Sequence, residues 1–253
     1  MTVLYGLIGK PLGHSLSSKY FNTKFEAQKT DAHYELFPLE NINELPQLIE
    51  AHPNLAGLNV TIPYKQEVIS YLDEIDFAAK MIGAVNTISV RRVAGKVILK
   101  GFNTDAFGFE ETLKTTITQR PPGMKALVLG TGGAARAVRY ILRKCGVPFR
   151  SVGRTYLKSD QLIYGLVTPS IIQEYKLIIN TTPAGMYPDL DDAPEIPYDY
   201  ITQDHILVDV IYNPEITKFL QYGLDKGAII ANGKKMFILQ AEAAWKIWQK
   251  NLD

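Results

Sequence analysis

Short apolar runs alternate with amphipathic stretches along most of the chain, and the runs end at glycine, proline or polar residues. Such runs are typical of buried strands, whereas apolar residues spaced three and four apart are typical of helices. The runs predict strands over residues 3–8, 34–37, 56–60, 87–92, 96–99, 127–129, 149–152, 176–179, 206–210 and 228–230. The amphipathic stretches predict helices over residues 17–27, 42–50, 64–71, 105–118, 134–144, 216–226 and 234–250. This alternation predicts an α/β fold with mainly parallel sheets.

Three local signals add detail to this pattern. Ser17 or Ser18 is expected to cap the first helix, because a serine hydroxyl accepts hydrogen bonds from free helical N–H groups. The pair Ala94-Gly95 separates two apolar runs and predicts a β-hairpin. Cys145 follows a helical run, and we expect it to be a buried apolar thiol rather than a nucleophile.

Composition narrows the classes of function. The 253 residues are 46% hydrophobic and 21% charged, which is ordinary for a soluble globular protein. A formal net charge of +1 gives no reason to expect nucleic acid or an anionic membrane as a partner. The single cysteine excludes an intrachain disulfide, and the histidines show no metal-ligand spacing, so we expect no metal. With no signal-peptide pattern and no apolar run of membrane-spanning length, we expect a cytoplasmic protein.

A glycine turn lies in the segment LVLGTGGAARAV, residues 127–138. The spacing Gly130-x-Gly132-x-x-Ala135 fits the dinucleotide-binding fingerprint, whose third small residue is Gly or Ala. Gly130 allows a tight turn, Gly132 lets backbone approach a pyrophosphate, and the helix N-terminus offers N–H groups to phosphate. An ordinary strand-to-helix turn has the same appearance, but the strand before it and the helix after it favour a Rossmann-type site.

Polar side chains cluster at the predicted strand ends of the first α/β part. They include two hydroxyls, an amine, an amide and a carboxylate, on Ser15, Ser17, Lys65, Asn86 and Asp105. Taken singly, each has an ordinary alternative as a helix cap, a turn residue or a solvated lysine. Because ligands of open α/β sheets bind outside the carboxyl ends of the strands, the set together favours a small, polyhydroxylated, charged ligand.

Seven segments, in order along nearly the whole chain, resemble the signature segments of the shikimate dehydrogenase family. They are IGKPLGHSLS (8–17), NVTIPYK (59–65), GAVNT (83–87), GFNTD (101–105), NTTPAGM (180–186), DVIYNP (209–214) and GKKM (233–236) with Gln240. The resemblance implies reversible reduction of 3-dehydroshikimate to shikimate, with hydride passing to or from a nicotinamide, a step of aromatic amino-acid (chorismate) biosynthesis. It also implies a small-molecule substrate and a monomer or homodimer.

The resemblance implies a role for individual residues. Lys65 and Asp105 would form the catalytic pair that moves the hydroxyl proton while hydride passes to or from the nicotinamide. The substrate would be bound by Ser15, Ser17, Thr61, Lys65, Asn86, Asp105, Tyr212 and Gln240. The cofactor would be bound by Gly130, Thr131, Gly132, Gly133, Ala134, Arg154, Thr155, Lys158, Thr182, Val210 and Gly233.

Two domains are therefore expected. The first is an N-terminal α/β substrate-binding catalytic domain with a mainly parallel sheet, residues 1–104, completed by the C-terminal helix 234–253. The second is an NADP-binding Rossmann domain, residues 105–233.

Charge near the second strand of that domain predicts the cofactor. NAD-binding folds place an acidic residue about 20 residues past the glycine turn, on the ribose hydroxyls. Residues 151–158 contain no acid, and Arg154 and Lys158 suit a 2′-phosphate clamp, so we predict NADP. Two solvated surface cations are the alternative. Family members usually have Asn where this chain has Gly153, so one polar contact near the adenosine ribose is expected to be missing.

Two rival functions stay open from the sequence. One is a broad-specificity quinate/shikimate dehydrogenase, and the other is a non-catalytic regulatory homologue. The presence of both Lys65 and Asp105 argues against the second.

Overall fold

The computed structural model describes residues 2–13, 15–117, 123–155 and 161–250. Its chain divides into two compact units: unit 1 is Met1–Thr104 with Ala241–Asp253, and unit 2 is Asp105–Gln240. The chain passes from unit 2 back to unit 1 between Gln240 and Ala241, inside the C-terminal helix α8 (Lys234–Gln249). The sequence analysis instead assigned that whole helix to the first domain. Among the described residues, none of the helices combines the length and the apolar character that a membrane crossing needs.

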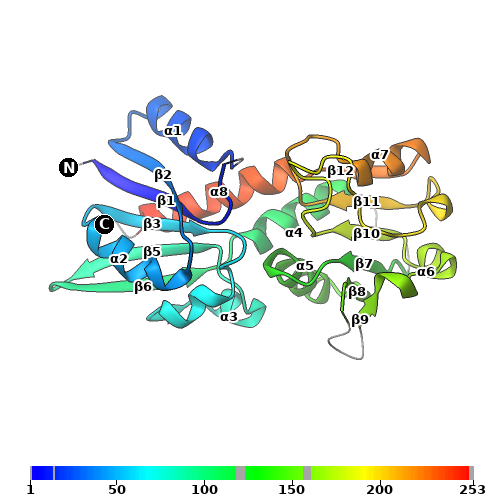
Figure 1. The fold of residues 1–253 in the computed structure, drawn as a ribbon, viewed down its shortest axis with the longest axis horizontal. Helices are drawn as coiled ribbons and strands as arrows, with labels where there is room; N and C mark the ends of the chain where they lie inside the picture. The colour runs from blue at the N-terminus through cyan, green and yellow to red at the C-terminus, as the bar shows by residue number, and fades with distance from the viewer. Residues whose placement is uncertain (1, 14, 118–122, 156–160, 251–253) are drawn as a thin grey trace. The chain divides into compact units, whose positions relative to one another are not determined.

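Over the described residues, unit 1 has an α/β fold, a six-stranded sheet with helices on both faces (Figure 1). Its elements are β1 (Val3–Gly9), α1 (Ser17–Ala27), β2 (Ala32–Pro38), η1 (Ile42–Glu44), α2 (Leu45–Ala51), β3 (Leu55–Val60), η2 (Glu67–Tyr71), β4 (Glu74–Ile75), α3 (Phe77–Ile82), β5 (Thr87–Val93), β6 (Lys96–Phe102) and the end of α8. The strand order is β2-β1-β3-β5-β6-β4. Strands β2, β1 and β3 run parallel, and β5 is antiparallel to both of its neighbours.

Two hydrophobic clusters cover the two faces of this sheet. One gathers aliphatic side chains of β1, β3 and β5 with those of α2 and the segment around η2. The other is aromatic and joins α1, β1 and β2 to α8: Tyr5 stacks on Trp248 at 4.8 Å between ring centroids, and Phe21 stacks on Tyr34 at 4.6 Å. This second cluster fixes the end of α8 on unit 1.

The predicted hairpin of unit 1 is confirmed. Strands β5 and β6 pair antiparallel from Thr87↔Phe102 to Val93↔Lys96, leaving a two-residue loop. Both loop residues have positive φ, 50° for Ala94 and 80° for Gly95. This is the turn that matches the right-handed twist of paired strands.

Unit 2 is a parallel sheet with helices, and its strands lie side by side in Figure 1. Its elements are α4 (Asp105–Thr116), β7 (Ala126–Leu129), α5 (Gly133–Lys144), β8 (Phe149–Gly153), β9 (Gln161–Ile163), η3 (Tyr164–Leu166), α6 (Pro169–Glu174), β10 (Leu177–Asn180), η4 (Tyr198–Tyr200), β11 (Ile206–Asp209), α7 (Lys218–Asp225), β12 (Ile229–Ala231) and the start of α8. The strand order is β12-β11-β10-β7-β8-β9, and every pairing is parallel.

This order is that of a Rossmann fold. Numbered from β7 as the first strand, the sheet reads 6-5-4-1-2-3, and the direction of winding reverses between β7 and β10. Ligands of open parallel sheets bind outside the carboxyl ends of the strands at this reversal. The predicted Rossmann-type fold is confirmed, and the glycine turn follows β7 directly.

Several sequence expectations differ from the structure. The capping prediction for Ser17 and Ser18 is wrong: both lie inside α1, the N-cap is Leu16 without a side-chain bond, and Ser18 Oγ instead donates to Tyr34 O at 3.1 Å. Cys145 is exposed rather than buried, because it is the C-cap of α5, where the chain leaves the helix. The pattern also missed β4, α3, β9 and α6, which have two to six residues each.

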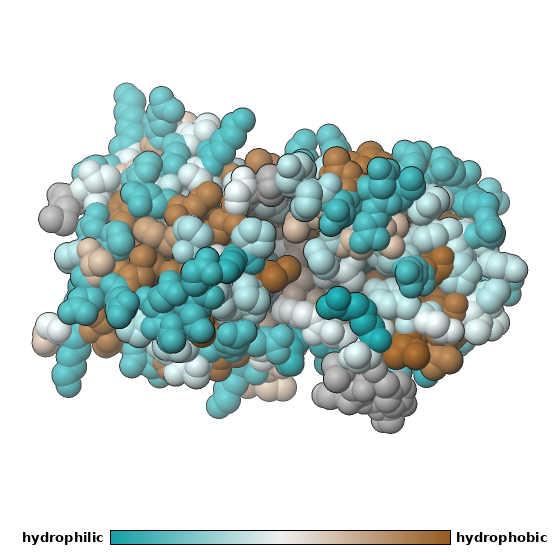
Figure 2. Space-filling model, viewed as in Figure 1, coloured by the Kyte–Doolittle hydropathy of each residue, from teal (hydrophilic) through white to brown (hydrophobic). Residues whose placement is uncertain are grey.

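The face of the molecule drawn in Figure 2 is mainly hydrophilic. Figure 2 shows polar side chains over most of the visible face, with apolar ones scattered among them. This agrees with the ordinary charge content and near-zero net charge of the sequence.

Candidate functional site

The loop after β1 carries the first candidate pair in unit 1. Ser17 is the first residue of α1 and is buried, and its backbone N–H donates to Ser15 Oγ at 3.2 Å. Ser15 N in turn donates to Leu12 O at 3.0 Å. The loop is therefore folded on itself, and the two serines lie next to each other.

Thr61 and Lys65 follow β3. Thr61 N donates to Ile8 O at 2.9 Å, which holds this turn beside the end of β1. We expected a helix over residues 64–71, but Lys65 lies in a turn and only the 3₁₀ helix η2 follows. The physical reason is a competing bond: Lys65 O accepts from Val85 N at 2.7 Å instead of taking part in a helical ladder. This bond also ties the lysine backbone to the strand connection next to it.

A buried amide and hydroxyl network surrounds Asn86. Its Oδ1 accepts from Thr104 N at 2.7 Å, and its Nδ2 donates to Thr104 Oγ1 at 2.9 Å. Asn59 Nδ2 donates to both Asn86 O and Thr87 Oγ1 at 3.2 Å, and Tyr34 OH donates to Asn59 Oδ1 at 2.8 Å. Because each of these polar groups has a partner in the interior, the network fixes the segment that ends at Thr104.

Asp105 follows directly on Thr104 and is the first residue of α4 in unit 2. The side chain is 6% exposed. A carboxylate in the first turn of a helix interacts favourably with the positive end of the helix dipole. The preceding Asn103 donates from Nδ2 to Ala84 O at 2.9 Å, so the chain on the unit 1 side of Asp105 is well anchored.

The unit 1 candidates meet at one edge of the sheet. Strands β1 and β3 are parallel, so the serine loop and the Thr61–Lys65 turn follow the same carboxyl edge. Strand β5 is antiparallel to β3 and begins beside Asn59, so Asn86 lies at that edge as well. The structure thus brings together Ser15, Ser17, Thr61, Lys65 and Asn86 within unit 1.

The glycine turn follows β7 in unit 2 and has the geometry of the fingerprint. Gly130 has φ 109°, and a Cβ on it would lie 2.6 Å from Thr181 Oγ1, so no other residue fits without strain. Thr181 locks the turn from β10 by donating from N and Oγ1 to Leu129 O, at 2.9 and 2.5 Å. The next strand thereby fixes the exit of the chain from β7.

Gly132 presents open space where a ligand is expected. It is the N-cap of α5, and a Cβ built on it meets no atom within 4 Å. Gly133 and Ala134 open the helix, and Ala135 is fully buried against the sheet. A twelve-residue helix with open space at its N-cap glycine can bind a phosphate at its N-terminus.

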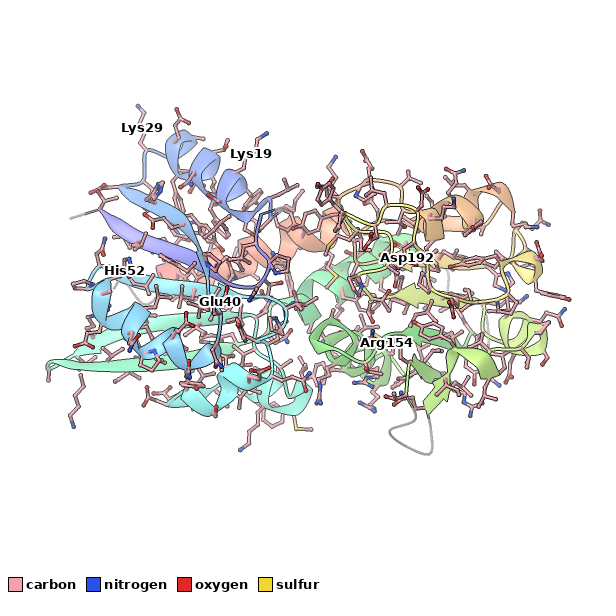
Figure 3. All side chains as sticks on the ribbon, in the orientation of Figure 1. Lys19, Lys29, Glu40, His52, Arg154 and Asp192 are labelled. Carbon is pink, nitrogen blue, oxygen red and sulfur yellow. The ribbon has the colours of Figure 1, made fainter. Side chains whose placement is uncertain are left out.

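Arg154 (Figure 3) follows β8 and is exposed. Thr155 comes next and is exposed as well. Lys158, the other predicted cation, lies outside the described residues. Gln161 Nε2 donates to Thr155 O at 2.9 Å.

A second buried network, which the sequence pattern did not predict, joins the loops after β10 and β11. Asn180 Nδ2 donates to both carboxylate oxygens of Asp209 at 3.2 Å, and Thr182 donates to Asn180 Oδ1 from N and Oγ1, at 3.0 and 2.7 Å. Asp209 also accepts from Ile211 N at 3.0 Å and from Thr217 Oγ1, the N-cap of α7, at 2.6 Å.

Burial raises the pKa of Asp209 from 3.8 to about 6, although the three donors favour the charged form. The carboxylate therefore holds two loops and a helix start in place at a cost in desolvation. The signal that was available in the sequence is the eight-residue spacing from Asp209, at the end of a predicted strand, to the Thr217 cap of the next helix.

The loop after β11 and the start of α8 form the last candidate group. Gly233 N donates to Ile211 O at 2.8 Å, and a Cβ on Gly233 would lie 2.1 Å from Val210 O, so only glycine allows this close approach. The ring of Tyr212 lies 4.5 Å from that of Phe237. Gln240 Nε2 donates to Phe237 O at 3.0 Å, so Tyr212 and Gln240 share one neighbour.

Apart from Gln240, which lies within α8, these unit 2 groups follow the carboxyl ends of parallel strands. The glycine turn follows β7, Arg154 follows β8, Thr182 follows β10, and Val210 and Tyr212 follow β11. The arrangement provides a helix N-terminus for phosphate, a cation at the end of the second strand, and polar groups beside the point where the winding reverses.

Comparison with known proteins agrees with this geometry. Residues 7–88 match the family model described as the shikimate dehydrogenase substrate binding domain. A protein of Clostridium beijerinckii named shikimate dehydrogenase (NADP(+)) is 42% identical over 255 aligned positions, covering 97% of this chain and 92% of that protein.

Two solved structures have the same fold over nearly the whole chain. Shikimate dehydrogenase from Aquifex aeolicus superposes with a TM-score of 0.84 at 36% identity, covering 98% of this chain and 93% of the other. The enzyme from Thermus thermophilus, solved in complex with NADP(H) and shikimate, gives a TM-score of 0.82 at 32% identity, covering 98% and 94%. The chain belongs to the shikimate dehydrogenase family.

Proposed function

We propose that this protein catalyses the NADP-dependent, reversible reduction of 3-dehydroshikimate to shikimate, a step of aromatic amino-acid (chorismate) biosynthesis. The observation that carries the proposal is the placement of the polar and glycine motifs at the carboxyl edges of the two sheets, in a chain 42% identical to an NADP-dependent relative. The substrate is a small molecule with a carboxylate and several hydroxyl groups, and hydroxyl and amide side chains suit it.

Substrate binding is assigned to side chains of both units. Ser15, Ser17, Thr61 and Asn86 come from unit 1, and Tyr212 and Gln240 come from unit 2. Unit 1 thereby supplies hydroxyl groups from two neighbouring loops, which suit the carboxylate and ring hydroxyls of the substrate. These roles rest on the matching family segments and on the clustering within each unit.

Lys65 and Asp105 are the proposed proton-transfer pair. Oxidation of the ring 3-hydroxyl requires that its proton be removed as hydride leaves the carbon, and reduction requires that the proton be returned. Lys65, as an ammonium group, donates to the carbonyl oxygen during reduction. The pair takes the proton back during oxidation. The bond from Val85 N to Lys65 O and the network around Thr104 restrict the backbone of each partner, which suits a positioned acid and base.

The residues of unit 2 fit NADP. Open space at Gly132 and the N-terminus of α5 suit the pyrophosphate, Arg154 suits the 2′-phosphate, and residues 151–155 contain no acid that would oppose it. Thr131, Thr182, Val210 and Gly233 are assigned to the same ligand by their place at this edge. When bound, NADP supplies the hydride acceptor for oxidation, and its reduced form supplies the hydride donor for the reverse reaction.

The test is an absorbance assay of nicotinamide reduction with purified full-length protein. Shikimate and quinate are each combined with NADP and with NAD. The proposal predicts the highest kcat/KM for shikimate with NADP. Comparable values for quinate would instead indicate the broad-specificity enzyme, and no turnover in any combination would indicate a non-catalytic homologue. A cytoplasmic location and a monomeric or homodimeric state stay predictions from the sequence.

A further inference from the structure

Gly153 and Gln161 occupy one space at the ends of β8 and β9. The two strands pair in parallel with Gly153 opposite Ile163 and Ser151 opposite Gln161. A Cβ built on Gly153 would lie 2.3 Å from Gln161 Nε2 and 3.1 Å from the methyl group of Thr131. The glutamine carboxamide therefore fills the place that a side chain at position 153 would take, next to the glycine turn.

The carboxamide also holds the turn that follows β8. Gln161 is 5% exposed, and its Nε2 donates to Thr155 O at 2.9 Å. It thus touches the backbone at Gly153 and bonds to the backbone at Thr155, on both sides of Arg154. A buried amide with this geometry restricts the backbone of residues 153–155, and the exposed Arg154 lies at the centre of that segment.

We propose that Gln161 is a positioning residue for recognition of the adenosine 2′-phosphate of NADP. By fixing the backbone before and after Arg154, Gln161 fixes the Cα position from which the arginine side chain extends. Less conformational freedom is therefore lost when the phosphate binds the guanidinium group. The carboxamide is uncharged and does not repel the phosphate, whereas the acidic side chain typical of NAD sites at this strand end does. The inference rests on the proposed role of Arg154 in the clamp.

The test measures binding rather than turnover, on the full-length protein, by titration calorimetry. The probes are adenosine 2′,5′-bisphosphate, which carries the 2′-phosphate, and 5′-AMP, which lacks it. Gln161→Met keeps an unbranched side chain of similar size but removes the donor to Thr155 O. We expect it to weaken binding of the bisphosphate about threefold to tenfold, the cost of leaving one flexible side chain unordered, and to leave 5′-AMP within about twofold.

Two further variants sharpen the result. Gln161→Glu is expected to weaken bisphosphate binding more than Gln161→Met does, because its carboxylate repels the phosphate. Gln221→Met is the matched control, since Gln221 is exposed on α7 and also donates a side-chain bond, to Asp225 at 2.8 Å. The control should bind both probes as the parent does. Gln161→Leu replaces Gln161→Met if thermal melting shows the latter to be unfolded.

The outcomes separate this inference from the function it rests on. An unchanged bisphosphate preference in Gln161→Met, or equal weakening of both probes, overturns the positioning role. If Arg154→Ala keeps the preference for the bisphosphate, the clamp itself is wrong and the role of Gln161 falls with it. Absence of shikimate turnover in the parent contradicts the proposed function, whichever result the binding experiment gives.

Discussion

At the scale of single residues, two glycines of one turn have different jobs. A Cβ on Gly130 would meet Thr181 Oγ1 at 2.6 Å with the backbone at φ 109°, whereas a Cβ on Gly132 would meet nothing within 4 Å. Gly130→Ala is therefore expected to lower the free energy of unfolding by about 1–3 kcal/mol. Gly132→Ala is expected to leave stability near that of the parent.

Cofactor binding is expected to depend on Gly132 rather than on the stability of the fold. Because the space above Gly132 suits the pyrophosphate, Gly132→Ala should weaken NADP binding while the fold stays intact. Denaturant titration and NADP titration of both variants check this. Equal stability loss in the two variants would contradict the assignment of roles, and so would full NADP affinity in Gly132→Ala.

Residue chemistry was also where the sequence was most informative. The glycine spacing, the serine loop and Lys65 could be assigned to strand ends, because apolar runs locate the strands and the motif residues follow them directly. The partners of those residues could not be assigned. The bonds of Asn86 to Thr104, and of Asn180 to Asp209, join positions 18 and 29 residues apart, which no local pattern reveals.

At the scale of elements, the buried carboxylate of Asp209 links β10, β11 and α7. Burial raises its pKa from 3.8 to about 6, so between these values the folded protein holds a proton that the unfolded chain releases. The contribution of this group to stability is full below about pH 4 and is lost as the pH rises through 6.

Asp209→Asn removes this titration. The difference in unfolding free energy between the parent and the variant is expected to fall by up to about 1.4 kcal/mol per pH unit from pH 4 to pH 6. Denaturant unfolding across that range measures it, and Asp225→Asn on the surface of α7 controls for the loss of one negative charge. A difference that stays constant with pH would contradict the account of Asp209.

The packing of α8 on unit 1 gives another prediction. The indole of Trp248 lies against Gly57 of β3, where a Cβ would be 2.3 Å from Nε1, and Nε1 donates to Ile88 O at 2.9 Å. Gly57→Ala should destabilise the protein by about 1–3 kcal/mol, because the ring must move and its bond is lost. Gly165→Ala, which meets no atom within 4 Å, should be close to neutral. Thermal and denaturant unfolding distinguish the two, and equal stabilities would show that the indole adapts freely.

Elements with strong periodicity could be predicted, whereas four short elements, β4, α3, β9 and α6, were missed. The long helices α5 and α8 and the apolar strands of unit 2 follow from their pattern. Strand β9 has three residues and begins with a buried glutamine, so its sequence resembles a loop. The turn at Lys65 was wrongly predicted as a helix. The bond from Val85 N to Lys65 O that competes with the helix forms only in the tertiary structure, so the local sequence does not reveal it.

At the scale of the whole molecule, two α/β units could be inferred, because parallel strands need helical crossovers and these appear as alternating patterns. The glycine spacing indicated that the second unit is of the Rossmann type, whereas the order of the strands in either sheet came only from the structure. The boundary between the units inside α8 could not be inferred, since the pattern of a continuous amphipathic helix does not show which part packs on which unit.

Ligand-linked stability tests the cofactor preference in the intact protein. A ligand that binds only the folded state at 100 times its Kd adds about 2.7 kcal/mol to stability. We expect NADP to raise Tm clearly more than NAD does at the same concentration, because only NADP offers a 2′-phosphate to Arg154. Arg154→Ala should bring the two shifts together. Equal shifts in the parent would contradict the predicted preference.

The shared proton-transfer role of Lys65 and Asp105 is tested most directly by a double-mutant cycle on turnover with saturating shikimate and NADP. Lys65→Ala and Asp105→Asn are each expected to lower kcat about 10²–10⁴-fold, as loss of an acid–base group does. The double variant should be little worse than the more damaged single one, because residues that act as a unit are not additive. Lys96→Ala, at an exposed lysine of β6, should match the parent. Turnover of Lys65→Ala within about threefold of the parent, or losses that multiply in the double variant, would contradict a shared proton-transfer role.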